Sequence, residues 1–246
     1  MKTSQKKTIA LLAFPVLFAG MLALIPSCSK DDDSAAYVCA TCNSTPNALA
    51  ANDASAKGIY KGILVGSTGT ISINIQNGSD LITATMVIDA DSVALTSTVS
   101  VVNGETYIAP FTGIYNGSPV SVTFEVGPTG DDPFMVSSDI PGHPNMVFKL
   151  YKETSTSLIE AFQGMVTNQG EPGTFNFIVA RSLNVWGYVV QSDDPSEPAS
   201  TGNGTISGND LIEDGHTIGT INGDVIHGSF QDNNSHTIVI DGHRTL

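Results

Sequence analysis

From residue 58 onward, apolar and polar side chains alternate along a series of short segments. In 120–126, valine or phenylalanine occupies every even position, and polar residues lie between them. Because successive side chains of a strand point to opposite faces, a period of two predicts a strand with one face on a core. The same alternation occurs in 71–75, 146–150, 175–179 and 238–240. The pattern predicts an all-β domain over residues 58–246.

Asparagine-glycine pairs separate many of these segments. They occur at 77–78, 103–104, 116–117 and 222–223, and Gly208-Asn209 and Asp241-Gly242 are weaker signals of the same kind. Asn-Gly tolerates the positive φ angles at both central positions of a type I′ turn, which matches the twist of a hairpin. We therefore predict an antiparallel meander of hairpins that forms a β-barrel or a β-sandwich.

Two parts of the predicted domain carry similar motifs. Tyr60-Lys61-Gly62, followed by 69–73, resembles Phe162-Gln163-Gly164, followed by 173–177, and a hydrophobic segment comes next in each part, at 86–88 and 188–190. This spacing favours two similar halves, 58–152 and 153–246, with chance repetition of common strand patterns as the alternative. The aromatic-Lys/Gln-Gly opening is similar to the start of lipocalin-like and other calycin-like barrels. That resemblance implies a barrel with an interior cavity.

The N-terminal residues have the composition of an export signal. Three lysines precede residue 8, and an uncharged, largely apolar run follows over 9–25. This run is short for a membrane-spanning helix, which needs about 20 apolar residues. Ile25 and Ser27 precede Cys28 in a pattern that resembles the lipobox of bacterial lipoproteins, although Pro26 departs from it. The resemblance implies a signal peptide over 1–27 and acylation of Cys28.

The residues after this cysteine are similar to the export signal of certain Gram-negative surface lipoproteins. Lys30, Asp31 and Asp32 carry that resemblance. It implies a protein anchored in outer-membrane lipid through the acylated Cys28 and exposed at the cell surface. We expect 28–57 to form a lipidated tether, because 34–57 is rich in Ala, Ser, Thr and Asn and lacks an alternating pattern.

The tether contains Cys39 and Cys42, the two cysteines that remain once Cys28 is acylated. An oxidising compartment favours a disulfide between them, and half of a zinc site is the alternative. The formal net charge is −14, with only 10 Lys and Arg against 24 Asp and Glu. Because binding to a phosphate backbone requires clustered basic residues, this charge argues against nucleic acid as a partner.

Candidate chemistry is sparse. The sequence lacks the local motifs of zinc proteases, phosphate-binding loops and serine hydrolases, so we expect no cofactor. The acidic stretches 193–197 and 210–214 suit calcium, and exposure to solvent is the alternative explanation for them.

Four residues are candidate ligand contacts. With 222–223 as a two-residue loop, Ile218 would face His227 and His216 would face Ser229. His216 and His227 would then be diagonal neighbours, able to share a metal or a ligand, or simply exposed. Trp186 and Tyr188 lie two residues apart on a predicted strand and would point the same way. They would stack on a sugar ring or belong to the core.

These observations favour a non-catalytic binding or cell-envelope accessory module whose ligand is an extracellular glycan. Two alternatives stay open: a calycin-like carrier of a small apolar molecule, and a hydrolase whose carboxylates meet only in the fold. The first needs a closed barrel with an apolar cavity, and the second needs paired carboxylates in a cleft.

Overall fold

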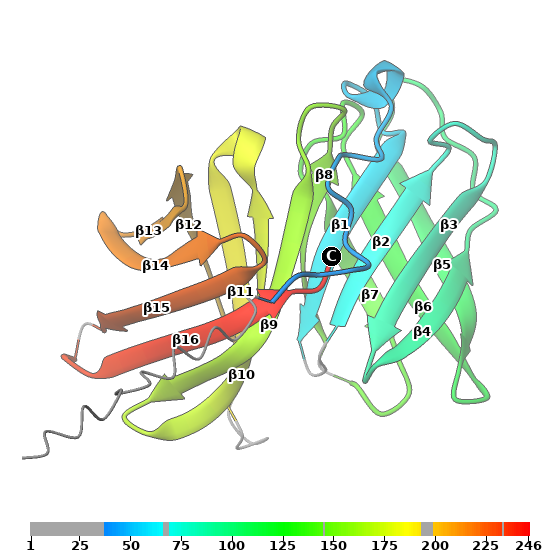
Figure 1. Ribbon diagram of the computed structural model, residues 1–246. Helices are drawn as coiled ribbons and strands as arrows, with labels where there is room; N and C mark the ends of the chain where they lie inside the picture. The colour runs from blue at the N-terminus through cyan, green and yellow to red at the C-terminus, as the bar shows by residue number, and fades with distance from the viewer. Residues whose placement is uncertain (1–36, 66–68, 145, 193–198, 233) are drawn as a thin grey trace, which may run out of the picture. The chain divides into compact units, whose positions relative to one another are not determined.

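The computed structural model describes residues 37–65, 69–144, 146–192, 199–232 and 234–246, and in them the chain is built almost entirely from strands (Figure 1). The first eight strands are β1 (Gly58–Val65), β2 (Gly69–Ile75), β3 (Ile82–Ile88), β4 (Asp91–Thr96), β5 (Tyr107–Tyr115), β6 (Ser118–Val126), β7 (Phe134–Asp139) and β8 (Val147–Glu153). The next eight are β9 (Ile159–Asn168), β10 (Glu171–Ala180), β11 (Val185–Ser192), β12 (Ser200–Ser207), β13 (Asp210–Glu213), β14 (His216–Asn222), β15 (Val225–Gln231) and β16 (Thr237–Arg244). Two short 3₁₀ helices, η1 (Ala50–Asn52) and η2 (Arg181–Leu183), are the only helices in the described residues. The all-β prediction is confirmed.

The first eight strands form one antiparallel sheet in the order β7-β6-β5-β4-β3-β2-β1-β8. Consecutive strands pair as hairpins from β1 to β7, and β8 returns to pair with β1 along its length. Hydrogen bonding is interrupted only between β7 and β8, so this sheet is a nearly closed barrel.

The second eight strands form a closed barrel in the order β10-β11-β12-β13-β14-β15-β16-β9. Its closure comes from β16, which pairs with β9 from Ile238↔Asn168 to Arg244↔Phe162. Since closure leaves no free strand edge, every strand of this barrel has two neighbours. Of the two predicted architectures, the chain has the barrel.

The similar motifs occupy equivalent places in the two barrels. Tyr60-Lys61-Gly62 lies in β1 and Phe162-Gln163-Gly164 in β9, the first strand of each set. Gly62 and Gly164 both lie where the last strand of their barrel passes close by. A Cβ on Gly62 would lie 2.8 Å from the Lys149 carbonyl oxygen, and one on Gly164 would lie 2.0 Å from that of Asp241. The recurring glycine therefore has the same packing role in each barrel.

Apolar side chains fill the interior of the first barrel. They come from alternate positions of β1 to β6, as in β2, where buried and half-buried residues alternate without a break. Tyr60, Phe111 and Phe124 are fully buried there and contact one another at ring-centroid distances of 5.1 and 6.4 Å. These side chains form the core of the first barrel.

The outer faces of β1 and β8 pack against β9, β10 and β11. Ile63 of β1 is buried in one cluster with Ile159, Ile178 and Val189. The buried amide of Asn176 donates a hydrogen bond of 2.9 Å to the Leu64 carbonyl oxygen across this contact. Burial on both faces explains why β10 lacks the alternating exposure of an ordinary barrel strand.

The predicted turns have mixed outcomes. Asn116-Gly117 forms the expected two-residue loop, with φ angles of 48° and 78° between the paired residues Tyr115 and Ser118. Asp241-Gly242, in contrast, lies inside β16, so the turn predicted there is wrong. A Cβ on Gly242 would lie 2.7 Å from the Gln163 carbonyl oxygen, which shows that this glycine permits close strand packing.

The hairpin between β14 and β15 differs from its predicted register. Asn222 pairs with Val225 and Thr220 with His227, so the loop is Gly223-Asp224. Gly223 has a φ of 60°, and Asn222 is not among the residues with positive φ. Glycine at the first central position is the type II′ pattern, which competes with the Asn-Gly pattern for the same sequence. No helix in the described part of the chain is both long and apolar enough to cross a bilayer.

Candidate ligand-binding site

The second barrel contains a cavity of about 1270 Å³ that is widely open to solvent at one end. Residues from the β9–β10, β13–β14 and β15–β16 connections surround the opening, because every second turn of an up-and-down barrel lies at the same end. We call this end the mouth. The opposite end, beside the β14–β15 turn and the C-terminus, we call the closed end.

Apolar side chains form one part of the cavity wall, and polar side chains such as Asn168, Ser200 and Thr217 line the rest. The apolar lining residues are Val166, Phe177, Tyr188, Val190, Ile218, Phe230, Ile238 and Ile240. Toward the closed end the interior is filled by fully buried side chains, among them Phe162, Phe175 and Trp186. Three aromatic rings connect the filled and hollow parts: Phe177 stacks on Trp186 at 4.9 Å and on Tyr188 at 5.7 Å. These aromatic rings thus join the core to the cavity wall.

Acidic and histidine side chains line the mouth. They are Glu171, Glu213, Asp214, Asp232, His216 and His236. Glu213 is the last residue of β13, and burial, with a smaller contribution from neighbouring Asp214, raises the pKa of its carboxyl group. Burial and the nearby Glu213 charge likewise raise the pKa of the Tyr188 phenol. Glu213 therefore lies at the boundary between the apolar wall and solvent.

Asp232 has a structural role at the same opening. Its carboxylate accepts hydrogen bonds of 2.8 Å from the backbone N–H groups of Asn234 and His236, which shapes the β15–β16 turn. These bonds hold the pKa of Asp232 below its usual value, and the bond from the His236 N–H has the larger effect. The mouth consequently keeps this negative charge at neutral pH.

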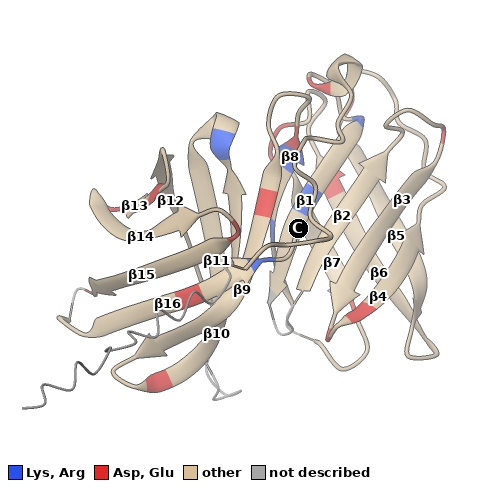
Figure 2. Ribbon diagram, viewed as in Figure 1, with Lys and Arg blue, Asp and Glu red and all other residues tan. Residues whose placement is uncertain are grey.

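The two basic residues of the second barrel lie away from this mouth. Arg181 follows β10 and forms an ion pair of 2.6 Å with Glu160, and Arg244 lies at the end of β16. From β12 to β16, Arg244 is the only Lys or Arg in the sequence (Figure 2). Both arginines thus lie near the closed end, where Glu160 and Asp224 pair with them, and neither lines the mouth.

The structure separates His216 from His227. His216 lines the mouth, whereas His227 is exposed on the barrel's outer surface and contacts Asp241 of β16. The predicted facing pairs, Ile218 with His227 and His216 with Ser229, are wrong because of the register of the hairpin. A bulge between β13 and β14 adds a further shift, since Leu211 pairs with Gly219 and Ile212 with Thr217.

Trp186 and Tyr188 do point the same way, into the barrel. Trp186 is fully buried and its indole N–H donates a hydrogen bond of 2.9 Å to the Thr205 carbonyl oxygen. It belongs to the core, so its ring is not an exposed platform for a sugar. Tyr188 remains partly exposed and lines the cavity.

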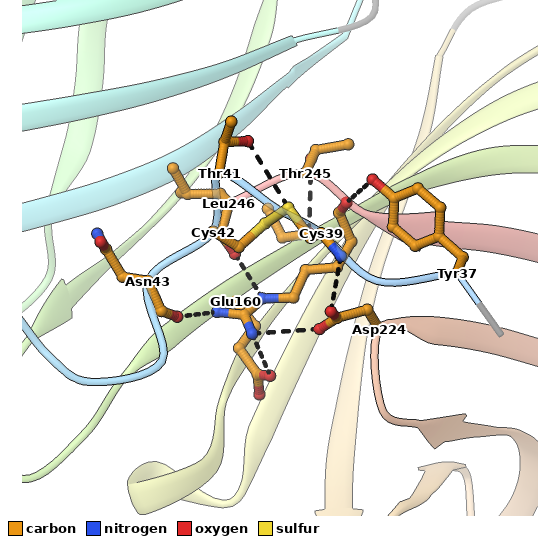
Figure 3. The surroundings of a disulfide bond; sticks show 11 residues. Tyr37, Cys39, Thr41, Cys42, Asn43, Glu160, Asp224, Thr245 and Leu246 are labelled. Carbon is orange, nitrogen blue, oxygen red and sulfur yellow. Dashed lines mark hydrogen bonds and ion pairs between the residues drawn. A yellow bond between two sulfur atoms is a disulfide. The ribbon is translucent and has the colours of Figure 1, made fainter. Parts of the chain in front are cut away.

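Cys39 and Cys42 form a disulfide beside the closed end of the second barrel (Figure 3). The Cys39 N–H donates to the Asp224 carboxylate at 2.8 Å, and the Asn43 carbonyl oxygen accepts a hydrogen bond of 2.6 Å from Arg244. Tyr37 donates through its hydroxyl group to the Arg244 carbonyl oxygen at 3.1 Å. The N-terminal segment is therefore fixed to this barrel.

The same segment continues onto the first barrel. The Asn47 N–H donates to the buried Glu153 carboxylate at 2.7 Å, and the Asn77 side chain donates to the Asn47 carbonyl oxygen at 2.9 Å. We call residues 37–53 the strap. Composition predicted a tether for this stretch, but its backbone groups find charged and amide partners on both barrels. Those partners are distant in sequence, so the local pattern did not indicate them.

Several predicted residues lie outside the described part of the chain. They are Cys28, Lys30, Asp31, Asp32 and the acidic stretch 193–197. Among the described residues, no group of three or more His, Cys, Asp or Glu side chains is arranged to hold a metal ion.

Sequence reasoning missed most of the cavity. Its lining residues come from eight strands and three turns, so no local spacing brings them together. The available signal was the absence of Lys and Arg from β12 to β15, combined with acids at every second connection. Comparison with known protein families and with curated protein sequences found no match.

Proposed function

We propose that this protein is a non-catalytic binding module whose second barrel takes up a small molecule with an apolar body. The observation that carries this proposal is the contrast between two barrels of the same strand order. The first contains a large cluster of buried apolar side chains, whereas in the second apolar residues such as Val190 and Ile218 line an open cavity of about 1270 Å³. Such a volume exceeds the roughly 300–1,000 Å³ of ordinary ligand pockets, so a small molecule fits inside.

The apolar cavity favours the carrier alternative over a glycan. Sugar rings stack on accessible aromatic faces, but Trp186 is buried beneath Phe177 and Tyr188. Removing apolar surface of a ligand from water contributes about 25 cal/mol per Å², and a closed β-barrel provides that environment without a conformational change.

A neutral fluorescent probe, N-phenyl-1-naphthylamine, tests this proposal. The purified full chain should enhance the probe's fluorescence with saturable binding at one site. Val190→Phe places a larger ring in the cavity and should weaken binding about tenfold, because overpacking costs about 1–3 kcal/mol. Val87→Phe is the matched control, since Val87 lies on the outer face of β3, between the core residues Met86 and Ile88. Equal binding by both variants, or chemical conversion of the probe, would count against the proposal.

We further propose that the protein acts outside the cell as an acylated lipoprotein, which the lipobox-like residues before Cys28 support. Metabolic labelling with an acyl analogue should mark the wild type, and Cys28→Ala should lose the label. A label that persists in this variant would contradict acylation at this site.

Surface display is proposed on the resemblance carried by Lys30, Asp31 and Asp32. Replacing all three with alanine should keep the acyl label and abolish digestion by protease added to whole cells. If protease still removes the triple variant from cells, these residues are not an export signal.

A further inference from the structure

Among the described residues, the mouth is lined by four carboxylates and two histidines and by no Lys or Arg. Glu171, Glu213, Asp214 and Asp232 are acidic, and the other two groups are His216 and His236. Neither Arg181 nor Arg244 belongs to the lining, and both lie toward the other end of the barrel. An opening lined by carboxylates above low-dielectric walls concentrates cations and repels anions.

Glu213 is the carboxylate best placed to meet a bound molecule. It lies in the cavity lining at the end of β13, close enough to Tyr188 for its charge to act on the phenol. Among the described residues, no Lys or Arg forms an ion pair with it. Ionised Glu213 is thus partly withdrawn from water without a cationic partner, an arrangement that a ligand's positive charge would complete.

Tyr188 adds a second favourable contact for a cation. Its ring lines the cavity and stacks on Trp186 at 5.7 Å, so its orientation is fixed by the core. The face of an aromatic ring attracts an organic ammonium group, and this attraction strengthens when the pair is shielded from water. Glu213 and Tyr188 together offer a carboxylate and an aromatic ring at the top of an apolar chamber.

We infer that the second barrel selects amphiphiles with a cationic head group, with an organic ammonium beside Glu213 and Tyr188 and an apolar chain in the cavity. This inference rests on the proposed function and names the ligand class for the same site. A fatty acid, by contrast, would place its carboxylate among four like charges and lose affinity by repulsion.

Three ligands with the same eight-carbon chain separate these cases: octyltrimethylammonium, octanol and octanoate. Each is used to displace N-phenyl-1-naphthylamine from the full chain at low ionic strength, since salt screens exposed charges. We expect octyltrimethylammonium to bind about fivefold more tightly than octanol, and octanoate about fivefold more weakly, in line with about 1 kcal/mol per partly exposed ion pair. Raising the salt concentration should reduce both differences.

Two variants that each remove one negative charge identify the group responsible. Glu213→Gln should bring the preference for octyltrimethylammonium over octanol to within about twofold while leaving octanol binding unchanged. Asp210→Asn is the matched control on the same strand, because Asp210 is exposed and outside the cavity lining. It should keep the full preference.

The outcomes distinguish the inference from the function on which it rests. Octanol binding without tighter binding of octyltrimethylammonium would overturn the preference for a cationic head group and leave the cavity proposal standing. The same holds if Asp210→Asn abolishes this preference as fully as Glu213→Gln. If none of the three ligands displaces the probe, both are overturned.

Discussion

The folded protein disfavours the ionised form of the Glu213 carboxyl group. Burial in the mouth is the larger cause and the adjacent Asp214 the smaller, and both raise its pKa. An acid with a raised pKa in the folded state stabilises the fold fully only below its unfolded pKa. This stabilisation is lost as the pH rises through the folded pKa. Binding sites commonly retain such unfavourable groups because they serve the ligand.

We therefore predict that Glu213→Gln raises the melting temperature at pH 7. The glutamine is neutral at every pH, so the variant avoids the loss that ionisation causes in the wild type. The difference should shrink as the pH falls below about 4, where the ordinary glutamate carboxyl group is protonated in both folded and unfolded chains. Thermal unfolding followed by circular dichroism at both pH values measures it. A variant less stable than the wild type at pH 7 would show that Glu213 has a structural role.

In contrast to Glu213, the ionised carboxylate of Glu153 stabilises the fold, because it forms a buried ion pair with Lys61. The Lys61 Nζ and Glu153 Oε2 atoms are 2.6 Å apart and both side chains are almost fully buried. Glu153 also accepts hydrogen bonds from the backbone N–H groups of Asn47 and Ile159, so it joins β8, the strap and the start of the second barrel.

Glu153→Ala should lower the free energy of unfolding by about 3–5 kcal/mol, because it leaves the Lys61 ammonium buried without its partner. Urea denaturation measures the change. The double variant Lys61→Met/Glu153→Leu removes both charges and should recover most of the loss, since apolar replacement of a buried pair is often neutral. If the free energy of unfolding of Glu153→Ala lies within about 1 kcal/mol of the wild-type value, water must reach Lys61. That result would contradict the burial of this lysine.

The strands show how far local pattern determines this fold. Alternation over 120–126 sufficed to predict β6, and Asn116-Gly117 sufficed for the turn before it, because both depend on neighbouring residues only. Gly223 lies in the predicted turn but at its first central position, so the predicted register was wrong. Gly242 was predicted in a turn and instead permits a close contact between strands, which only the partner strand determines.

Gly164 and Gly62 provide a test of such close contacts. A Cβ on Gly164 would meet only backbone at its three nearest atoms, whereas one on Gly62 would also meet the flexible Leu150 side chain. Because a side chain yields more readily than a strand backbone, Gly164→Ala should destabilise more than Gly62→Ala, with both costs about 1–3 kcal/mol. Chemical denaturation of the two variants measures the difference. The reverse order would mean that the contact between β9 and β16 can widen easily.

The complete chain combines two barrels of the same strand order that differ in what fills them. Sequence similarity between 60–62 and 162–164 favoured two similar halves, and the alternating segments with their turns predicted a barrel or a sandwich. That the second barrel holds this cavity could not be predicted, because its lining depends on how residues from eight strands meet in space. The packing of the two barrels against each other through Ile63, Ile178 and Val189 could not be predicted either. Strands that are buried on both faces lose the alternating pattern that identifies a strand with one buried face.

The fluorescence of Trp186 tests the central claim most directly. It is the only tryptophan in the sequence, and it stacks on Phe177 and Tyr188, two aromatic residues that line the cavity. An octylammonium ligand with a nitroxide at the end of its chain should quench this fluorescence in a saturable manner. Unlabelled octyltrimethylammonium should reverse the quenching, and Val190→Phe should abolish it. Quenching that rises linearly without saturation, or that is equally strong in Val190→Phe, would show that the second barrel does not hold the ligand.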